Sequence, residues 1–410
     1  MKIVLISSGQ PSLNPRLVKE ADALVEAGYE VCVIYQYWNN WASKLDLSLL
    51  SSKKWQTIRV GGDPVKEKIT YWASRILFSV AKRLAASFSL KYKIAELAIG
   101  RCTFALVDEA KKNRADLYIA HNLGALPAAI IAAKKNQAKC GFDAEDFHRN
   151  EISNERQNLD VRLKSFIEDK YLNQVDYLTT ASPLINQAYQ NLYPKLKPTP
   201  LLNVFPKPNL PGKPNKNQTT LKLFWFSQTI GLGRGLEHIV QALNELNHPM
   251  IELHLLGNHN TTIKNQLCLS TSIVNWSRNN IFFYQPIMAE EIFSFALQFD
   301  VGLATESKYP FNRDICLTNK IFTYIQSGLA VIATDTTAQS KLLQEYPNSG
   351  FIYRNDSIVE LKEIIMRYFD DRNLLNDNQQ QNLSYASSTL NWDFEKNFFL
   401  TLVGQTLNKK

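Results

Sequence analysis

Short apolar runs alternate with amphipathic stretches along most of the chain. Residues 2–7 form an apolar run typical of a buried strand, and residues 16–27 carry Leu17 and Leu24 at helical spacing. A second apolar run follows at 30–35. Because a strand, a helix of about three turns and another strand occur in succession, the pattern predicts a parallel βαβ unit.

The same pattern recurs on both sides of residues 198–220, which are rich in proline, asparagine and lysine. Such a composition is typical of a linker between domains, so we expect two α/β domains. The expected divisions are 1–200 for the N-terminal domain, 201–220 for the linker, 221–378 for the C-terminal domain and 379–410 for a terminal helical segment. Further strands are predicted at 116–120, 139–143, 176–180, 221–226, 251–257, 280–285, 300–305 and 330–335, and further helices at 128–135, 183–192, 235–247, 289–298, 319–327 and 358–369.

Composition narrows the class of protein. The 410 residues are 45% hydrophobic and carry a net charge of +8, which suits nucleic acid, anionic membranes or phosphorylated small molecules. No pattern of a nucleic-acid-binding motif is present, so we expect no nucleic-acid partner.

The five cysteines are scattered without a CxxC spacing, which indicates neither a disulfide framework nor a metal site. With no long apolar segment or secretory signal, we expect a cytoplasmic protein.

Much of the positive charge lies at 66–93. Lys68, Arg75 and Lys82 are seven residues apart and form one stripe on a helix, beside an apolar face that includes Trp72 and Ile76. Two interpretations remain open. The helix either packs on its own sheet with a solvated basic edge, or lies on an anionic membrane surface at the inner face of the membrane.

Two segments of the second domain suit a phosphorylated ligand. After the strand at 221–226, Gly233 and Arg234 stand where a helix begins, so backbone N–H groups and a guanidinium can surround a diphosphate. A later helix opens at Asn319 and Lys320, where a cation opposes the helix dipole unless an anion lies nearby. The alternatives are a tight loop without a ligand and a solvated lysine.

In the first domain, candidate chemistry follows the strand ends. His121 directly follows one strand, and Asp143 and Glu145 follow the next, so all three are expected at the carboxyl edge of the sheet. There they can hydrogen-bond a ligand or exchange protons with it. The alternatives are a histidine that orders a loop and a solvated acidic loop. Gly9 lies in the first turn beside the expected ligand, and Arg16 either binds a phosphate, holds the acidic loop or is a surface arginine.

Six segments in order resemble GT-B glycosyltransferases of the family 4 type, from Met1 to about Trp392. The resemblance implies two Rossmann-like domains that face each other across a cleft, with the terminal segment crossing back to the first. It also implies retaining transfer from a nucleoside diphosphate sugar without an obligatory metal or cofactor. Arg234 and Lys320 would hold the donor phosphates, and His121 and the acidic loop would lie near the reacting sugar. The segments are NPRLVKEADALVEAGYEV, HNLGALPAA, FDAEDFHRNE, SQTIGLGRGLEHIVQAL, LTNKIFTYIQSGLAVIATD and NWDFEKNF.

The chain departs from that family at several positions. Gln228 stands where the donor loop usually has arginine, and Glu145 where histidine is frequent. Thr323 and Ile315 replace the two glutamates of the ribose helix, while Glu306 offers a carboxylate nearby. The residues expected at the donor are Gly9, Arg16, Gln228, Gly233, Arg234, Glu306, Asn319, Lys320 and Thr323, and the expected catalytic residues are His121, Asp143 and Glu145.

The expected function is transfer of a sugar to a growing surface glycan or a lipid-linked acceptor. Two rivals remain: a sugar-nucleotide epimerase of the same fold, and a binding or scaffold subunit that has lost transfer. The missing glutamates favour the scaffold, whereas Arg234, Lys320 and His121 oppose it.

Overall fold

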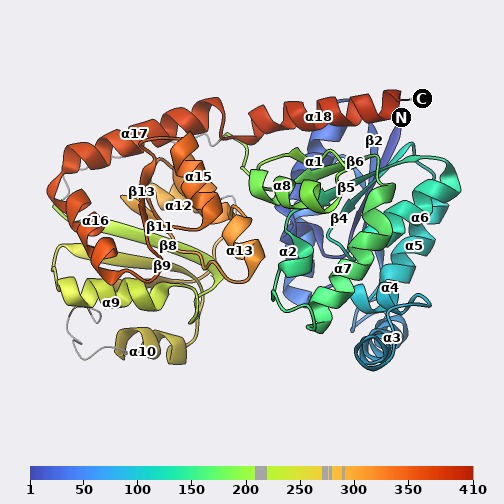
Figure 1. The fold of residues 1–410 in the computed structure, drawn as a ribbon, viewed down its shortest axis with the longest axis horizontal. Coiled ribbons are helices and arrows are strands. Elements are labelled where there is room, and N and C mark those ends of the chain that lie inside the picture. Colours follow the sequence, from blue (N-terminus) through green and yellow to red (C-terminus); the bar gives the residue numbers. More distant parts are fainter. Residues whose placement is uncertain (208–218, 270–275, 277–278, 289–290, 410) are drawn as a thin grey trace. The chain divides into compact units, whose positions relative to one another are not determined.

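The computed structural model describes residues 1–207, 219–269, 276, 279–288 and 291–409. The chain forms two compact units (Figure 1). Unit 1 comprises Met1–Leu202, Pro310–Asn312 and Lys396–Lys410, and unit 2 comprises Asn203–Tyr309 and Arg313–Glu395. A short segment from the second half of the chain and the terminal residues therefore belong to unit 1. Residues 208–218 of the expected linker lie outside the described residues.

Unit 1 is built on a seven-stranded sheet in which every strand pair is parallel, in the order β3-β2-β1-β4-β5-β6-β7. Five of these strands were predicted. The two edge strands were not: the exposed and polar residues of β3 leave no apolar run to recognise, and β7 has only two residues. The strands are β1 (Lys2–Ser7), β2 (Glu30–Gln36), β3 (Gln56–Val60), β4 (Leu117–His121), β5 (Lys139–Ala144), β6 (Tyr177–Thr180) and β7 (Thr199–Pro200).

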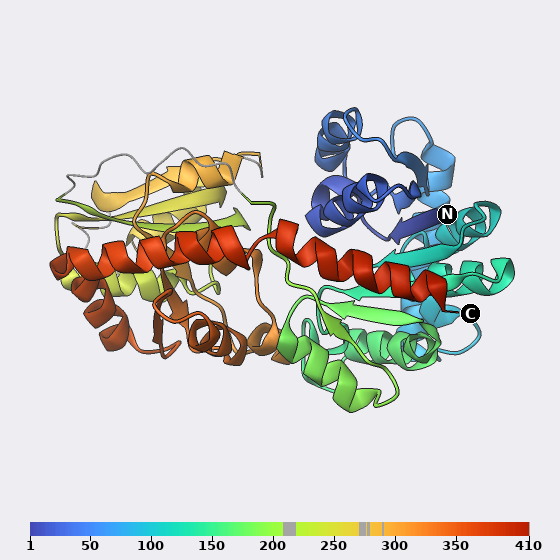
Figure 2. The ribbon, with the colours of Figure 1, turned by 90° about the horizontal axis from the view of Figure 1, so that it is seen from above.

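Helices flank this sheet (Figure 2). The first of them begins where the sequence pattern predicts, because Pro15 suits the first turn and Asn14 caps the helix by accepting the N–H of Leu17 at 3.0 Å. The helices are α1 (Pro15–Glu26), α2 (Asn40–Leu50), α3 (Lys68–Ser87), α4 (Ile94–Ile99), α5 (Thr103–Lys112), α6 (Leu126–Asn136), α7 (Leu159–Tyr171) and α8 (Pro183–Leu192), and α18 (Trp392–Asn408) continues into unit 1 from Lys396.

Unit 2 repeats this architecture with six parallel strands in the order β10-β9-β8-β11-β12-β13. The predicted helix at 289–298 is shorter in the structure, Ile292–Ala296, and its residues 289–290 lie outside the described part. The strands are β8 (Leu221–Thr229), β9 (Ile251–Asn258), β10 (Ile281–Tyr284), β11 (Val301–Ala304), β12 (Ala330–Thr334) and β13 (Gly350–Tyr353). The helices are α9 (Leu236–Leu246), α10 (Thr261–Leu269), α12 (Ile292–Ala296), α14 (Asn319–Gln326), α15 (Thr337–Glu345), α16 (Ile358–Asp370) and α17 (Arg372–Ser388), and α13 (Phe311–Ile315) enters unit 2 at Arg313.

Aromatic rings pack closely on one part of the unit 2 sheet. The ring of Phe224 on β8 stacks on Phe299 with centroids 4.5 Å apart and meets the edge of Tyr324 from α14. Gly302 on β11 makes room for that tyrosine, since a Cβ placed at Gly302 would lie 2.1 Å from the Tyr324 ring. The glycine therefore determines how closely α14 approaches the sheet.

We predict that Gly302→Ala destabilises the protein by about 1–3 kcal/mol, because the added methyl overpacks the contact with Tyr324. Gly231→Ala is the matched control in the same unit, since nothing lies within 4 Å of its Cβ position. The urea midpoint of unfolding measures both variants. Equal midpoints would show that the ring simply moves aside.

Candidate active site

The predicted site residues gather where the strand order of each sheet reverses. In unit 1 this point lies between β1 and β4, with Gly9 after the first strand and His121 at the end of the other. In unit 2 it lies between β8 and β11, which Arg234 and Glu306 follow. Open parallel sheets bind ligands outside the carboxyl ends of the strands at such points. Each unit thus has one candidate binding edge.

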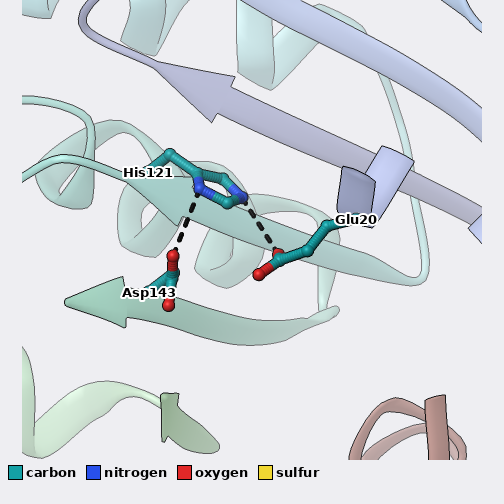
Figure 3. Close-up of side chains that lie close together, drawn as sticks. All are labelled: Glu20, His121 and Asp143. Carbon is teal, nitrogen blue, oxygen red and sulfur yellow. Dashed lines mark ion pairs between the residues drawn. The ribbon is translucent and has the colours of Figure 1, made fainter. Parts of the chain in front are cut away.

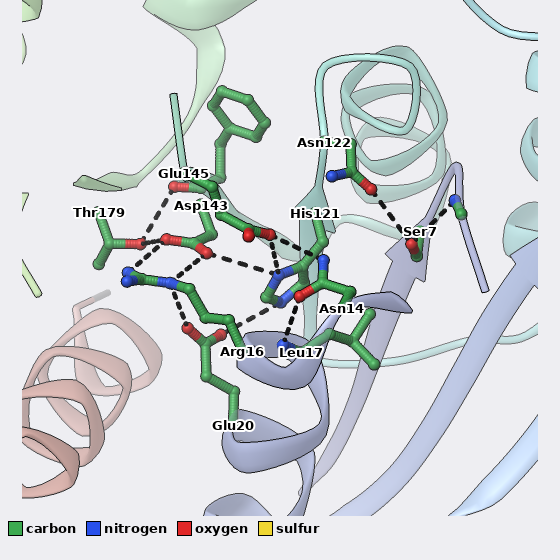
Figure 4. A network of polar contacts seen from close by, with 12 residues as sticks. Ser7, Asn14, Arg16, Leu17, Glu20, His121, Asn122, Asp143, Glu145 and Thr179 are labelled. Carbon is green, nitrogen blue, oxygen red and sulfur yellow. Dashed lines mark hydrogen bonds and ion pairs between the residues drawn. The ribbon is translucent and has the colours of Figure 1, made fainter. Parts of the chain in front are cut away.

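Four polar residues form a row across this edge of unit 1. Ser7 pairs in register with His121, His121 with Asp143, and Asp143 with Thr179, on four neighbouring strands. Thr179 donates its hydroxyl to Asp143 Oδ1 at 2.7 Å (Figure 4). The parallel register therefore brings residues from distant parts of the sequence into one polar cluster.

The His121 side chain is 0% exposed and lies between two carboxylates (Figure 3). Its Nε2 is 3.2 Å from Glu20 Oε2, and its Nδ1 is 3.5 Å from Asp143 Oδ2 and 3.9 Å from Glu145 Oε1. Burial alone lowers the pKa of a histidine, but the surrounding acids, chiefly Glu20, outweigh it and raise the pKa of His121 to about 10. The surrounding acids thus favour the charged form of His121.

Arg16 is fully committed to this buried cluster. Its Nε and Nη2 donate to the two oxygens of Asp143 at 2.5 and 2.7 Å, and its Nη1 donates to the carbonyl of Leu201 at 2.6 Å. Burial raises the pKa of the Asp143 carboxyl, but the Arg16 charge and hydrogen bonds hold it below its ordinary value. The prediction that Arg16 binds a donor phosphate is thus corrected: its donors are used inside the protein, and it holds the acidic strand end.

Glu145 is the carboxylate of this cluster that reaches solvent. Its side chain is 21% exposed, compared with 1% for Glu20 and for Asp143. Asn14, which caps α1 with its oxygen, donates its Nδ2 to Glu145 Oε1 at 2.7 Å. Gly9 lies nearby in sequence, and its N–H is bound to Ser7 Oγ at 3.1 Å. Glu145 is consequently both oriented and accessible.

Glu20, His121 and Asp143 are also the group among the described residues whose ligand atoms come close enough to suggest a metal, within 4.8 Å of one another. The arrangement suits ion pairs better. The two ring nitrogens of His121 face different carboxylates, and Arg16 already occupies both oxygens of Asp143. A metal would need these atoms to converge on one point. We therefore interpret the cluster as an ion network.

The rest of the acidic loop is largely shielded from solvent, because Phe147 and His148 are buried and Asp146 is half-buried. Asn312, from the short segment that joins unit 1, donates to Asp146 Oδ1 at 2.8 Å and accepts the N–H of Phe147 at 2.7 Å. Phe311 places its ring against Phe147, with centroids 5.6 Å apart. These contacts fix the course of the loop directly after Glu145. The alternative of a solvated acidic loop is therefore wrong for Asp143 and His148, which are buried.

At the edge of unit 2, a glycine turn leads into α9. Gly235 adopts a left-handed conformation with φ 79°, and a Cβ there would lie 2.8 Å from Thr305. Thr305 Oγ1 donates to the carbonyl of Arg234 at 3.1 Å, which ties the turn to the end of β11. The exposed Arg234 side chain donates to Ser227 Oγ at 2.8 Å. Arg234 therefore lies on a turn that opens a helix, as predicted, with a guanidinium that solvent reaches.

Lys320 lies in the first turn of α14 and has an internal anion. Its Nζ is 2.8 Å from Glu306 Oε1, and it lies over the Trp225 ring at 5.1 Å from the centroid. Glu306 also accepts from Thr318 at 3.1 Å and from Arg313 at 3.3 Å. A cation at the N-terminus of a helix is unfavourable unless an anion lies nearby, and here Glu306 is that anion. Glu306 gathers two cations, Lys320 and Arg313, at the unit 2 edge.

The remaining predicted donor residues differ in access. Gln228 is exposed near the end of β8, and Asn319 is half-buried at the start of α14. Gly233 has a positive φ of 72° and donates its N–H to Glu237. Thr323 is buried, so its side chain is closed to a ligand in this structure; the prediction of a donor contact there is not supported.

Two Rossmann-like units of parallel strands, each with its polar edge at the reversal of strand order, define the GT-B fold. The comparison with solved structures agrees over nearly the whole chain. HepE of Anabaena, solved with UDP and glucose, gives a TM-score of 0.71 at 13% identity and covers 99% of this chain and 100% of its own. Sucrose-phosphate synthase of Thermosynechococcus elongatus gives 0.68 at 14%, with 99% and 98% covered.

The fold also hosts other chemistry. A putative UDP-N-acetylglucosamine 2-epimerase of Listeria monocytogenes gives a TM-score of 0.58 at 11% identity, covering 100% of this chain and 97% of its own. The sequence matches no protein-family model, and no curated protein matches it. At these identities the likeness establishes the fold, and function depends on the residues of the site.

Four residues of the site were missed from the sequence. Glu20 carried a signal, because it lies four residues after Arg16 on a helix, so the two share a face. The contacts of Asn14 and Thr179 carried none, because they depend on strand register and on partners far along the chain. Arg313 lies only seven residues from Glu306, but no periodic pattern links the two.

We predict that Arg16→Ala destabilises the protein by about 3–5 kcal/mol, because it leaves the Asp143 carboxylate buried without its partner. Arg59→Ala is the control: Arg59 also pairs with two carboxylates, Asp63 and Glu67, but Arg59 and Glu67 are partly exposed, so about 1 kcal/mol or less is expected. Urea unfolding of both variants measures the difference. Similar losses would mean that the buried pair has no special role.

Proposed function

We propose that the protein is a glycosyltransferase that moves a sugar from a nucleoside diphosphate sugar to an acceptor hydroxyl. The observation that carries the proposal is the pair of cations at the reversal point of unit 2. Arg234 lies on the glycine turn that opens α9, and Lys320 lies in the first turn of α14. Two helix N-termini and two side-chain cations suit a diphosphate. HepE, of the same fold, is solved with UDP and with UDP-glucose, which supports this ligand class.

In this proposal, the unit 2 edge stabilises the departing diphosphate. Negative charge develops on the leaving oxygen as the sugar bond breaks, and Arg234 and Lys320 oppose it without a metal. Lys320 is held by Glu306 and Trp225, so it is positioned before the donor arrives. Gln228 and Asn319 offer neutral polar groups to the nucleotide. We expect neither an obligatory metal nor a cofactor.

The unit 1 edge would serve the acceptor and the reacting sugar. Glu145 is the accessible carboxylate and is oriented by Asn14, so it suits a hydrogen bond to the acceptor hydroxyl. His121 and Asp143 lie behind it. Retention of configuration and a glycan or lipid-linked acceptor are the outcomes that the resemblance to family 4 enzymes implies.

The exposed surface of α3 supports the proposal that the acceptor lies on a membrane. Ile69 is 88% exposed and Trp72 is 54% exposed, and Ile76 is exposed with them, so this face does not pack on the unit 1 sheet. The cations lie beside aromatic rings of the same helix, Arg75 over Trp72 and Lys82 over Phe78. Exposed apolar side chains beside cations suit the interface of an anionic bilayer. We propose that this face meets the inner surface of the membrane. Among the described residues, no helix has the length and apolar character needed to cross a bilayer.

Two other functions remain as rivals. The epimerase-like neighbour favours chemistry on the donor sugar alone, and the buried Thr323 favours a scaffold with weakened donor binding. Release of free sugar from a donor without acceptor would identify a transferase with water as acceptor. A changed sugar still joined to its nucleotide would identify an epimerase. No turnover with any donor would identify the scaffold.

We predict that one of a panel of UDP-, GDP- and TDP-sugars raises the melting temperature, because a ligand that binds only the folded state adds about 2.7 kcal/mol at a hundred times its Kd. Arg234→Ala should abolish this rise. Arg367→Ala, whose guanidinium lies over Phe351, should keep it. Equal rises in both variants would rule out Arg234 as a donor ligand.

We predict that the protein cosediments with phosphatidylglycerol vesicles but not with phosphatidylcholine vesicles, and that salt weakens binding, since the attraction is electrostatic. The double variant Trp72→Asp and Ile76→Asp should bind at least about tenfold more weakly. Val359→Asp, at an exposed apolar position of α16, is the control. Equal binding of all three proteins would remove α3 as the contact.

A further inference from the structure

Glu20 is a buried carboxylate that none of the motifs explains. It lies on α1, is fully buried, and neither of its oxygens makes a hydrogen bond of good geometry among the described residues. Its neighbours are charges: His121 Nε2 at 3.2 Å from Oε2, and Arg16 Nε at 3.6 Å from Oε1. An ionised carboxylate in such a place is stable only beside cations. Its position therefore depends on the charge of the imidazole it faces.

We propose that Glu20 is a positioning residue that holds His121 as an imidazolium, so that His121 is a fixed donor behind the acceptor site and Glu145 is the group that exchanges a proton with substrate. The first half of this proposal rests on geometry alone. The second half rests on the proposed glycosyl transfer.

The positions of the two carboxylates favour a proton on both ring nitrogens. Each nitrogen of His121 faces a carboxylate oxygen, Glu20 on one side and Asp143 on the other. A neutral imidazole has an N–H on one nitrogen and a lone pair on the other. That lone pair would then point at an anionic oxygen inside the protein, because the ring is fully buried. Neither ring nitrogen makes a hydrogen bond of good geometry among the described residues, so the contacts are ion pairs, and only the imidazolium presents a positive N–H to both carboxylates.

The charges around the ring agree with this assignment. Glu20 on α1 and Asp143 and Glu145 at the end of β5 face His121, and Arg16 on α1 offsets Asp143. Lys19 on α1 is the other nearby cation, and burial together with the charge of Arg16 lowers its pKa to about 7.

Tyr177 on β6 contributes no charge at neutral pH, because burial raises its pKa well above the ordinary value. Burial and Asp143 raise the pKa of Glu20 as well, while His121 acts against them. Glu20 and His121 are thus coupled, and removing the charge of Glu20 removes the largest attraction for the second proton of His121.

A charged His121 has a direct chemical consequence. An imidazolium has no free lone pair, so it cannot accept a proton from an acceptor hydroxyl. Glu145 lies 3.9 Å from His121 Nδ1, is held by Asn14 and reaches solvent, so it is the group in this cluster able to take that proton. His121 then keeps the carboxylates ordered and contributes a fixed positive charge.

The test is an NMR titration of the histidine side chains in the full chain. The signal of His121 is assigned by its loss in His121→Gln. In the wild-type protein, His121 should stay charged from pH 6 to about pH 9, beyond the ordinary histidine pKa of about 6.5. In Glu20→Gln, its titration midpoint should fall by at least about one pH unit, a tenfold change in proton affinity. Glu26→Gln, on the same helix but at the surface beside Lys396, should change nothing.

A wild-type His121 that titrates near its ordinary pKa, or an unchanged midpoint in Glu20→Gln, would overturn the proposal. If Glu20→Gln does not fold, the wild-type titration decides by itself. None of these signals depends on glycosyl transfer, so they stand even if no donor binds. Where transfer is detected, Glu145→Gln should remove the acidic limb of the kcat/KM profile, and its persistence would contradict the role of Glu145.

Discussion

The arrangement of unit 1 depends on the buried pair of Arg16 and Asp143. Burying two charges is unfavourable unless their geometry is good and their remaining hydrogen-bonding groups are used. Here both carboxylate oxygens and all of the guanidinium contacts are internal, including the carbonyl of Leu201. The pair joins the first helix to the fifth strand and to the end of the unit. Glu20 lies 3.6 Å from the Arg16 guanidinium and His121 lies 3.5 Å from Asp143, so one arginine orders most of the buried polar cluster.

Unit 2 uses the same principle with weaker burial. Glu306 follows β11 and gathers Lys320 and Arg313, as Asp143 gathers Arg16 in unit 1. Arg234 has only Ser227 as a hydrogen-bond partner for its side chain in the described contacts, and it is exposed. The internal anion of unit 2 can thus position cations without neutralising all of them. In unit 1, by contrast, Arg16 makes its contacts inside the protein, while the Glu145 carboxylate is accessible to solvent.

Much of the fold was predictable, and the reason is local. Every predicted strand that lies in the described residues is present, because a buried parallel strand is a continuous apolar run. The exposed edge strand β3 was missed because its side chains are little buried and therefore form no apolar run, although its residues do not lack strand propensity. The apolar face of α3 was predicted, but the sequence left open whether this face packs inside the protein or is exposed. An amphipathic pattern does not show what the apolar face contacts.

The sequence alone determined the alternation of strands and helices, the glycine turn before α9 and the placing of His121, Asp143 and Lys320 beside strand or helix ends. Tertiary structure decided which of these groups meet. Arg16 changed from a predicted phosphate ligand to an internal partner, and Glu20 entered the site, because their neighbours lie more than a hundred residues away in sequence. Periodicity records which face of an element is buried, whereas the contacts of a buried charge depend on strand register and order, which no local pattern encodes.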